Sequence, residues 1–132
     1  TNRDLELLGI AVKAMAGAHS PYSEVRVGAA VLGADGQIYP GCNVENATLG
    51  LSVCAERIAL FNAVAHGTPE IEAVVFTSNH PKVNSPCGAC RQVLLELAPQ
   101  ARVVYGDESG VRKVWGSPRA LLPDAFDGDW RS

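Results

Sequence analysis

The sequence predicts an α/β fold in which helices cover a mixed sheet of about five strands. Helical and strand patterns alternate along the chain, as in folds of this class. Hydrophobic residues make up 47% and charged residues 19% of the sequence, which is the balance of a packed globular protein. With 132 residues the chain has room for one core, so we expect residues 1–132 to form a single domain.

The chain opens with a predicted amphipathic helix over residues 3–16. Asp4 and Glu6 lie in its first turn, where the helix dipole favours acidic side chains. Apolar residues recur at helical spacing and form the predicted apolar face: Leu5, Leu8, Val12 and Met15.

A β-hairpin is predicted next. Residues 27–32 form a short apolar run, residues 34–36 supply the turn, and residues 37–44 resume the strand pattern. Pro40 and Gly41 interrupt the second strand, and proline lacks the N–H that an inner strand donates. We therefore expect this strand at an edge of the sheet or with a bulge.

Helices and strands alternate in the rest of the chain. Residues 54–66 combine strong helix formers with few polar side chains, so we expect a buried helix that Gly67 ends. Residues 71–78 contain a continuous apolar run, which is typical of a strand covered on both faces. The remaining predicted elements are a helix over 87–98, strands over 102–105 and 111–115 around a turn at 107–110, and a short helix that Ser117 and Pro118 begin and that runs through Leu122.

Charge and hydropathy argue against two classes of partner. The formal net charge is −3, and acidic and basic residues are interspersed, so no basic stripe is available to bind a nucleic-acid polymer. The apolar stretches are shorter than a membrane span, and residues 1–6 carry no signal pattern. We therefore expect a cytoplasmic protein with neither a nucleic-acid nor a membrane partner.

Three of the four cysteines form a candidate zinc site. Cys54 begins one predicted helix, and Cys87 and Cys90 begin another. A catalytic zinc takes three protein ligands and leaves its fourth position to water. Thiols at helix starts ionise readily, because the unpaired N–H groups there favour an anion.

The neighbours of these cysteines predict hydrolytic chemistry. Glu56 follows Cys54 by two residues on the same helical turn, where its carboxylate can move protons to and from a zinc-activated water without being a ligand. Removal of an amine from an aromatic ring needs such proton transfers. Arg57 and Arg91 each follow a cysteine closely, and we expect both to donate hydrogen bonds to the thiolates and draw charge from them.

Other uses of the cysteines remain open at this point. A structural zinc could be completed by Cys42, or Cys87 and Cys90 could be a redox pair at a helix start. Neither alternative gives Glu56 a role. A third alternative is a non-catalytic relative that keeps zinc and binds nucleosides, which the loss of Glu56 or of a ligand would favour.

Three segments carry a resemblance to a known family: Gly-Cys-Asn-Val-Glu-Asn-Ala at 41–47, Cys-Ala-Glu-Arg at 54–57 and Pro-Cys-Gly-Ala-Cys-Arg-Gln at 86–92. The chain resembles the small, homotetrameric class of zinc-dependent cytidine deaminases over nearly its whole length. Zinc deaminases in general combine Pro-Cys-x-x-Cys with a glutamate that is not a ligand. The resemblance implies a three-layer α/β/α fold, Zn²⁺, a homotetramer, and hydrolysis of cytidine or deoxycytidine to the uridine form.

The resemblance also implies roles for single residues. Asn43 and Glu45 would hold the ribose hydroxyl of the nucleoside substrate, Glu56 would also bind the pyrimidine edge, and Ala55 would be a further substrate contact. Phe126 would cover the base in a neighbouring subunit. Taken alone, Asn43 and Glu45 fit two polar positions on one face of a strand end, and Phe126 fits an ordinary core residue. Phe126 and Trp130 in an otherwise polar tail favour docking onto another surface.

Three positions depart from the family pattern. Val25 stands where an aromatic residue beside the nucleoside is common, Arg26 replaces a proline or small residue, and Leu49 replaces a frequent tyrosine in a segment that approaches a neighbouring site. Smaller side chains leave space in the substrate pocket and offer less contact to the base, so we expect modest efficiency on cytidine and tolerance of substituents on the base. Arg26 is expected as a polar contact at the rim of this pocket. The alternative substrate is a modified cytosine nucleoside or a cytosine-containing antibiotic such as blasticidin S.

Overall fold

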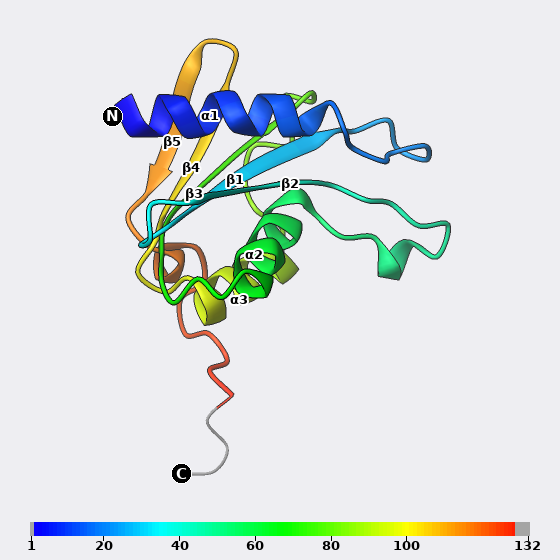
Figure 1. The fold of residues 1–132 in the computed structure, drawn as a ribbon. Coiled ribbons are helices and arrows are strands. Elements are labelled where there is room, and N and C mark those ends of the chain that lie inside the picture. Colours follow the sequence, from blue (N-terminus) through cyan, green and yellow to red (C-terminus); the bar gives the residue numbers. More distant parts are fainter. Residues whose placement is uncertain (1, 129–132) are drawn as a thin grey trace.

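A five-stranded sheet forms the centre of the computed structural model, which describes residues 2–128 (Figure 1). The strands lie in the order β2-β1-β3-β4-β5. Only β3 and β4 pair in parallel, and the other neighbours are antiparallel, so the sheet is mixed as predicted. The strands are β1 (Val27–Gly33), β2 (Ile38–Cys42), β3 (Ile71–Ser78), β4 (Arg102–Asp107) and β5 (Gly110–Trp115).

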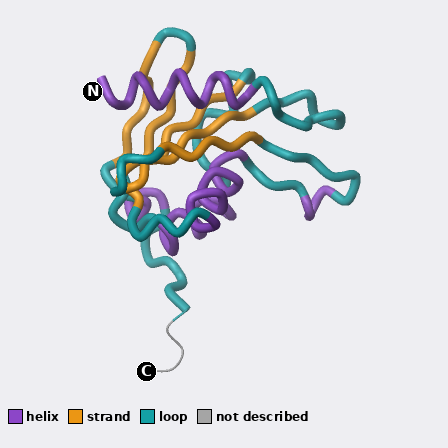
Figure 2. The backbone as a smooth tube through the Cα atoms, in the orientation of Figure 1, coloured by secondary structure: helices purple, strands orange, loops and turns teal. Residues whose placement is uncertain are grey.

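Helices cover both faces of this sheet. α1 lies across one face, and α2 and α3 lie together on the other, which gives the expected three α/β/α layers (Figure 1). Figure 2 shows the long loops that join α1 to β1 and β2 to α2. The helices of the described residues are α1 (Asn2–Met15), α2 (Ala55–Ala65) and α3 (Gly88–Leu97), with short 3₁₀ helices η1 (Leu49–Leu51) and η2 (Pro118–Leu121). None of the helices within residues 2–128 is long and apolar enough to cross a membrane.

Each face of the sheet has its own apolar core. Successive side chains of a strand point to opposite faces, so Ala30 and Leu32 of β1 pack with the α1 core, whereas Ala29 and Val31 join the core under α2 and α3. β3 divides in the same way and is buried on both faces, as predicted.

Two glycines allow the helices to lie directly on the hairpin. A Cβ atom at Gly41 would lie 2.4 Å from the backbone nitrogen of Ala59 in α2. At Gly28 it would lie 1.9 Å from the carbonyl oxygen of Ala11 in α1. No side chain fits at either position. The contact at Gly41 fixes the start of α2 over β2, and this start carries Cys54.

The buried face of α1 differs from the predicted one. Leu5 is 53% exposed and Val12 is 42% exposed, whereas the residues that face the sheet are Asp4, Leu7, Leu8 and Ala11. Asp4 is buried because its Oδ1 accepts hydrogen bonds from Nε and Nη2 of Arg102, at 2.9 and 2.7 Å. A partner on β4 therefore sets the rotation of the helix.

Several smaller predictions have mixed outcomes. Pro40 does lie on an outer strand, and its carbonyl oxygen accepts a hydrogen bond of 3.2 Å from Asn62 Nδ2. α2 is not fully buried, because Phe61 is 46% exposed and Val64 is 51% exposed. Ser117 precedes η2 but makes no capping hydrogen bond through its side chain. The docking predicted for Trp130 concerns a residue outside the described part of the chain.

Candidate metal centre and active site

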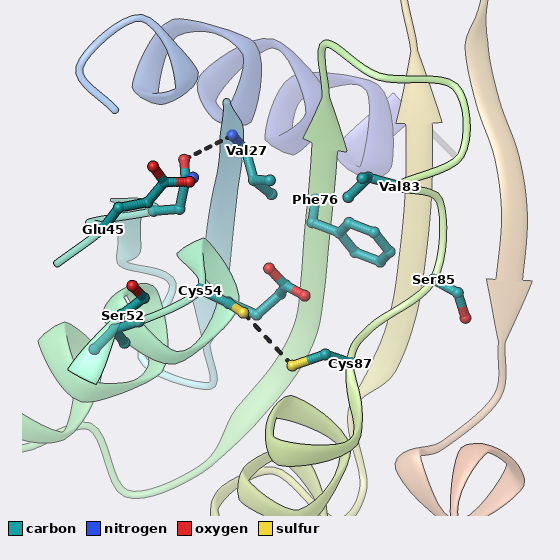
Figure 3. A pocket seen from close by; sticks show the side chains of 11 residues that line it. Val27, Glu45, Ser52, Cys54, Phe76, Val83, Ser85 and Cys87 are labelled. Atoms are coloured by element: carbon teal, nitrogen blue, oxygen red, sulfur yellow. Dashed lines mark hydrogen bonds between the residues drawn. The ribbon is translucent and has the colours of Figure 1, made fainter. Parts of the chain in front are cut away.

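Two helix starts bring three cysteines together. Cys54 is the N-cap residue of α2, Cys87 is the N-cap residue of α3, and Cys90 lies in the first turn of α3. Their Sγ atoms all lie within 4.8 Å of one another. Cys54 and Cys87 face each other across the gap between the helices, with their sulfurs 3.5 Å apart (Figure 3). Cys42 is not a member of this cluster.

The sulfur cluster fits a zinc ion. All of the cysteines are free thiols, and thiolates 2.3 Å from a tetrahedral zinc lie about 3.8 Å from one another. A hydrogen bond with Cys90 lowers the pKa of the Cys54 thiol, and Arg57 lowers it further, against the opposing effect of burial. The cluster therefore provides three converging sulfur ligands, one of which ionises readily.

The two arginines act on different parts of this cluster. Nη2 of Arg57 donates to the Cys54 sulfur at 3.8 Å. Arg91 differs from the prediction, because its guanidinium donates to three oxygens instead of to sulfur: Pro86 O and Ser85 Oγ, both at 2.8 Å, and Leu121 O at 2.9 Å. These bonds use three of the five N–H donors of the guanidinium, one on each nitrogen. Arg91 thus holds the loop that ends at Cys87 and ties it to η2.

Glu56 lies in the first turn of α2 and is only 4% exposed. Burial raises the pKa of its carboxyl to about 7, and the neighbouring Cys54 thiolate raises it as well. Its Oε1 is buried without a hydrogen-bond partner among the described residues. An orphaned buried carboxylate oxygen is costly, and next to three sulfurs it fits a site built to receive a further group.

A cavity of about 190 Å³ opens onto Cys54, Glu56 and Cys87. Its apolar walls are Val27, Phe76 and Val83, which Figure 3 shows around the space above the sulfurs. Ring contacts with Tyr105 at 5.3 Å and Trp115 at 6.5 Å hold Phe76 in place. The remaining lining residues are Asn43, Glu45, Ser52, Val53 and Ser85.

The sequence did not identify Phe76, Val83 or Ser85 as part of the site. A signal for Phe76 was present, because alternation along β3 sends Val74 and Phe76 to the face that carries α2 and α3. Val83 and Ser85 lie in the irregular segment before α3, where no periodicity guides a prediction.

Two of the departures lie elsewhere than predicted. Val25 packs against the core under α2 and α3 and is not among the residues that line the cavity. Arg26 does not reach the cavity rim, because its Nη1 donates to the carbonyl oxygen of Ala16 at 3.2 Å, just after α1. Leu49 is 71% exposed on η1.

The predicted substrate contacts separate into two groups. Asn43 and Glu45 line the cavity, and Asn43 is 8% exposed. Ala55 is fully buried under the sheet and does not line the cavity. Phe126 is 60% exposed on the C-terminal segment, where its carbonyl oxygen accepts a hydrogen bond of 2.9 Å from Gln92 Nε2. It does not line the cavity of its own chain.

A three-layer α/β/α fold that joins three cysteines and a buried glutamate at one cavity defines a zinc-binding enzyme of the deaminase type. Residues 1–107 match the sequence model of the family described as the cytidine and deoxycytidylate deaminase zinc-binding region. The chain belongs to this family.

Individual relatives agree with this assignment. The chain is 42% identical to a cytidine deaminase of Halalkalibacterium halodurans over 125 residues, which cover 93% of each protein. It is also 42% identical to a cytidine deaminase of Mycobacterium tuberculosis, with 93% of this chain and 89% of the relative covered. The crystal structure of a Burkholderia pseudomallei cytidine deaminase superposes with a TM-score of 0.84 at 44% identity, over 92% of this chain and 97% of that one.

Proposed function

We propose that this protein hydrolyses cytidine and deoxycytidine to the corresponding uridine nucleosides and releases ammonia. The observation that carries the proposal is the buried, unpartnered oxygen of Glu56 beside three cysteine sulfurs at one cavity. Cys54, Cys87 and Cys90 are the proposed zinc ligands. When bound, zinc lowers the pKa of water and makes it nucleophilic at neutral pH.

Glu56 is the proposed proton carrier. A carboxyl with a pKa of about 7 is ionised in a large fraction of molecules at neutral pH and also gives its proton back readily. Glu56 takes a proton from the attacking water and delivers it to the ring nitrogen. The water oxygen bonds to the ring carbon that carries the amine, and its second proton passes to the amine. The C–N bond then breaks, a carbonyl forms at that carbon, and ammonia leaves. The sum of these steps is one nucleoside and one water converted to one uridine nucleoside and one ammonia.

Nucleoside recognition is assigned to the cavity walls. Val27, Phe76 and Val83 offer apolar contact to a flat base, and Asn43 and Glu45 are proposed to hold the ribose. Ala55 contributes only through its backbone in this scheme, because its side chain is buried. A nucleic-acid polymer is a poor substrate for a chain with a net charge of −3.

We also propose that the active form is a cytoplasmic homotetramer of this single domain, residues 1–132. Exposed apolar side chains on η1 and α2 support an interface between copies: Leu49, Leu51, Phe61 and Val64. Phe126 is 60% exposed on the C-terminal segment and lies outside the cavity of its own chain, which leaves its side chain available to the cavity of a neighbour. Free thiols that must bind metal suit a reducing compartment.

The activity is tested by measuring ammonia and uridine formation from cytidine, deoxycytidine and base-substituted analogues with zinc-loaded protein. Equal amounts of ammonia and uridine product are expected. Absence of ammonia release from all of these compounds would reject the proposal. Mixing Phe126→Ala chains with Glu56→Gln chains tests the shared site, because activity returns only where intact Phe126 and Glu56 meet at one cavity.

A further inference from the structure

Asn43 and Glu45, two of the polar side chains that line the cavity, are both bonded to the segment that leads into β1 and ends at its first residue, Val27. Oδ1 of Asn43 accepts from Val27 N and its Nδ2 donates to Val25 O, both at 2.8 Å. Oε1 of Glu45 accepts from Tyr22 N at 3.0 Å and from Ser23 N at 3.1 Å. The Ser23 hydroxyl donates to Oε2 of Glu45. One segment, residues 20–27, therefore orients both side chains.

This segment is fixed in a turn that its sequence does not favour by itself. Glu24 has a φ of 61°, in the left-handed region that side chains rarely adopt. Three bonds hold it: Glu24 N to Ser20 O at 3.0 Å, Asn79 Nδ2 to Glu24 O at 3.2 Å, and Arg26 N to Asn79 Oδ1 at 2.9 Å. A strained turn that persists because its surroundings fix it is typical of functional sites.

The direction of the Ser23 hydroxyl is also fixed. Its oxygen accepts a hydrogen bond of 3.0 Å from Val25 N, so its own proton is directed to Glu45. Ser23 does not line the cavity, whereas Glu45 does. A change at Ser23 therefore reaches a bound molecule indirectly, through Glu45 or through Val25, whose carbonyl oxygen accepts from Asn43.

The acceptor sites of Glu45 can be counted. An ionised carboxylate offers about four lone-pair sites, two on each oxygen. Tyr22 N and Ser23 N fill those of Oε1, and the Ser23 hydroxyl fills one of those of Oε2. One site on Oε2 remains for a donor from the cavity, which is the requirement for binding a single hydroxyl group.

We propose that Ser23 is a positioning residue for nucleoside binding, whose hydroxyl holds the Glu45 carboxylate so that one lone pair of Oε2 is presented to a ribose hydroxyl. This inference rests on the proposed function. The same hydrogen bond lowers the pKa of Glu45, which keeps the acceptor ionised. Ser23 itself touches neither the base nor the reacting atoms.

The test compares Ser23→Ala with Ser23→Thr, which keeps the hydroxyl at an exposed position, and with Ser109→Ala as a matched control in the exposed β4–β5 turn. Each zinc-loaded protein is assayed with cytidine and with 2′,3′-dideoxycytidine, which lacks the 2′- and 3′-hydroxyls of the ribose and keeps the 5′-hydroxyl. For Ser23→Ala we expect KM for cytidine to rise about tenfold with kcat within about twofold of the parent, since one charge-assisted bond is lost. KM for dideoxycytidine should not change, and Ser23→Thr should restore KM for cytidine.

Other results overturn the inference in distinct ways. An equal rise in KM for both nucleosides would mean that Ser23 only supports the shape of the pocket. An unchanged KM for cytidine would mean that Glu45 needs no orientation by Ser23. If the parent protein turns over neither nucleoside, the proposed function is rejected, and so is this inference, which rests on it. Normal turnover by the parent with either of the first two results rejects the role of Ser23 alone.

Discussion

The two faces of the sheet bury polar groups in opposite ways. Under α1 the buried charge of Asp4 is paired with Arg102 at 2.7 Å, and the surrounding side chains are apolar and closely packed. Under α2 and α3, buried Glu56 has an oxygen without a partner, and a cavity of about 190 Å³ lies next to it. The buried carboxylate of Asp4 is satisfied by another side chain, whereas that of Glu56 keeps one oxygen available to a bound group.

The difference follows from how each face meets its helices. α1 lies flat on its face of the sheet, and its side chains pack against β1 and β3. α2 and α3 both begin beside the cavity, and helix starts present unpaired N–H groups that attract anionic ligands. The unpartnered oxygen of Glu56 therefore marks the face under α2 and α3 as the functional face, whereas the paired Asp4 belongs to the supporting face under α1.

Removing one sulfur should give the largest effect on the functional face. Cys87→Ser should lose zinc nearly completely, because two remaining sulfurs cannot hold the ion as three do. Cys42→Ser is the matched control and should keep one zinc per chain, since Cys42 is not in the cluster. Elemental analysis of the purified proteins measures both. Loss of zinc in the Cys42 variant would show that the site uses a fourth sulfur.

Neutralising the buried carboxylate of Glu56 should have the next largest effect, which is on turnover. Glu56→Gln should lower turnover by about 10⁴-fold, at the upper end for a general acid/base group, while zinc content and Tm are retained. Glu72→Gln, an exposed carboxylate on β3, is the control and should retain turnover. Rates and zinc content are measured on the same samples. Near-normal turnover in zinc-loaded Glu56→Gln would remove this residue from the mechanism.

The supporting face should respond in stability alone. Asp4→Ala leaves Arg102 without its partner, and because Arg102 is 32% exposed we expect a loss of about 2 kcal/mol in the free energy of unfolding. Glu6→Ala breaks an exposed pair with Arg3 and should cost less than about 0.5 kcal/mol. Urea unfolding gives both values. A fall in turnover per folded Asp4→Ala molecule would contradict the separation of the two faces.

Local patterns made most of the secondary structure and the sulfur ligands predictable. Cys87 and Cys90 lie on one helix start, and Cys54 begins another, so short spacings indicated all three. On α1, Leu8 is buried as predicted, but Leu5 and Val12 are exposed. The chain contains two overlapping apolar stripes, and the choice between them depends on a partner for Asp4 that is 98 residues away. No spacing rule reports a contact of that kind.

Hydrogen bonds that hold the loops of the site in place were the other class of contact that the sequence did not reveal. Arg91 bonds to Leu121, 30 residues away, and Ser23 bonds to Glu45, 22 residues away. Arg91 lies in α3 and Leu121 ends η2, whereas Ser23 and Glu45 both lie in irregular segments. In neither pair does helical or strand periodicity indicate the partner. Their geometry depends on the completed fold, so a residue such as Ser23 emerges only when the turn around Glu24 is seen.

The placing of Pro40 on an outer strand also bears on how copies of the chain behave when concentrated. An outer strand with a full row of free N–H groups invites strand-by-strand growth into aggregates. Pro40 interrupts that row, and its carbonyl oxygen is bonded to Asn62. The opposite outer strand, β5, exposes the charges of Arg112 and Lys113. Both outer strands of the sheet thus resist fibre-like stacking.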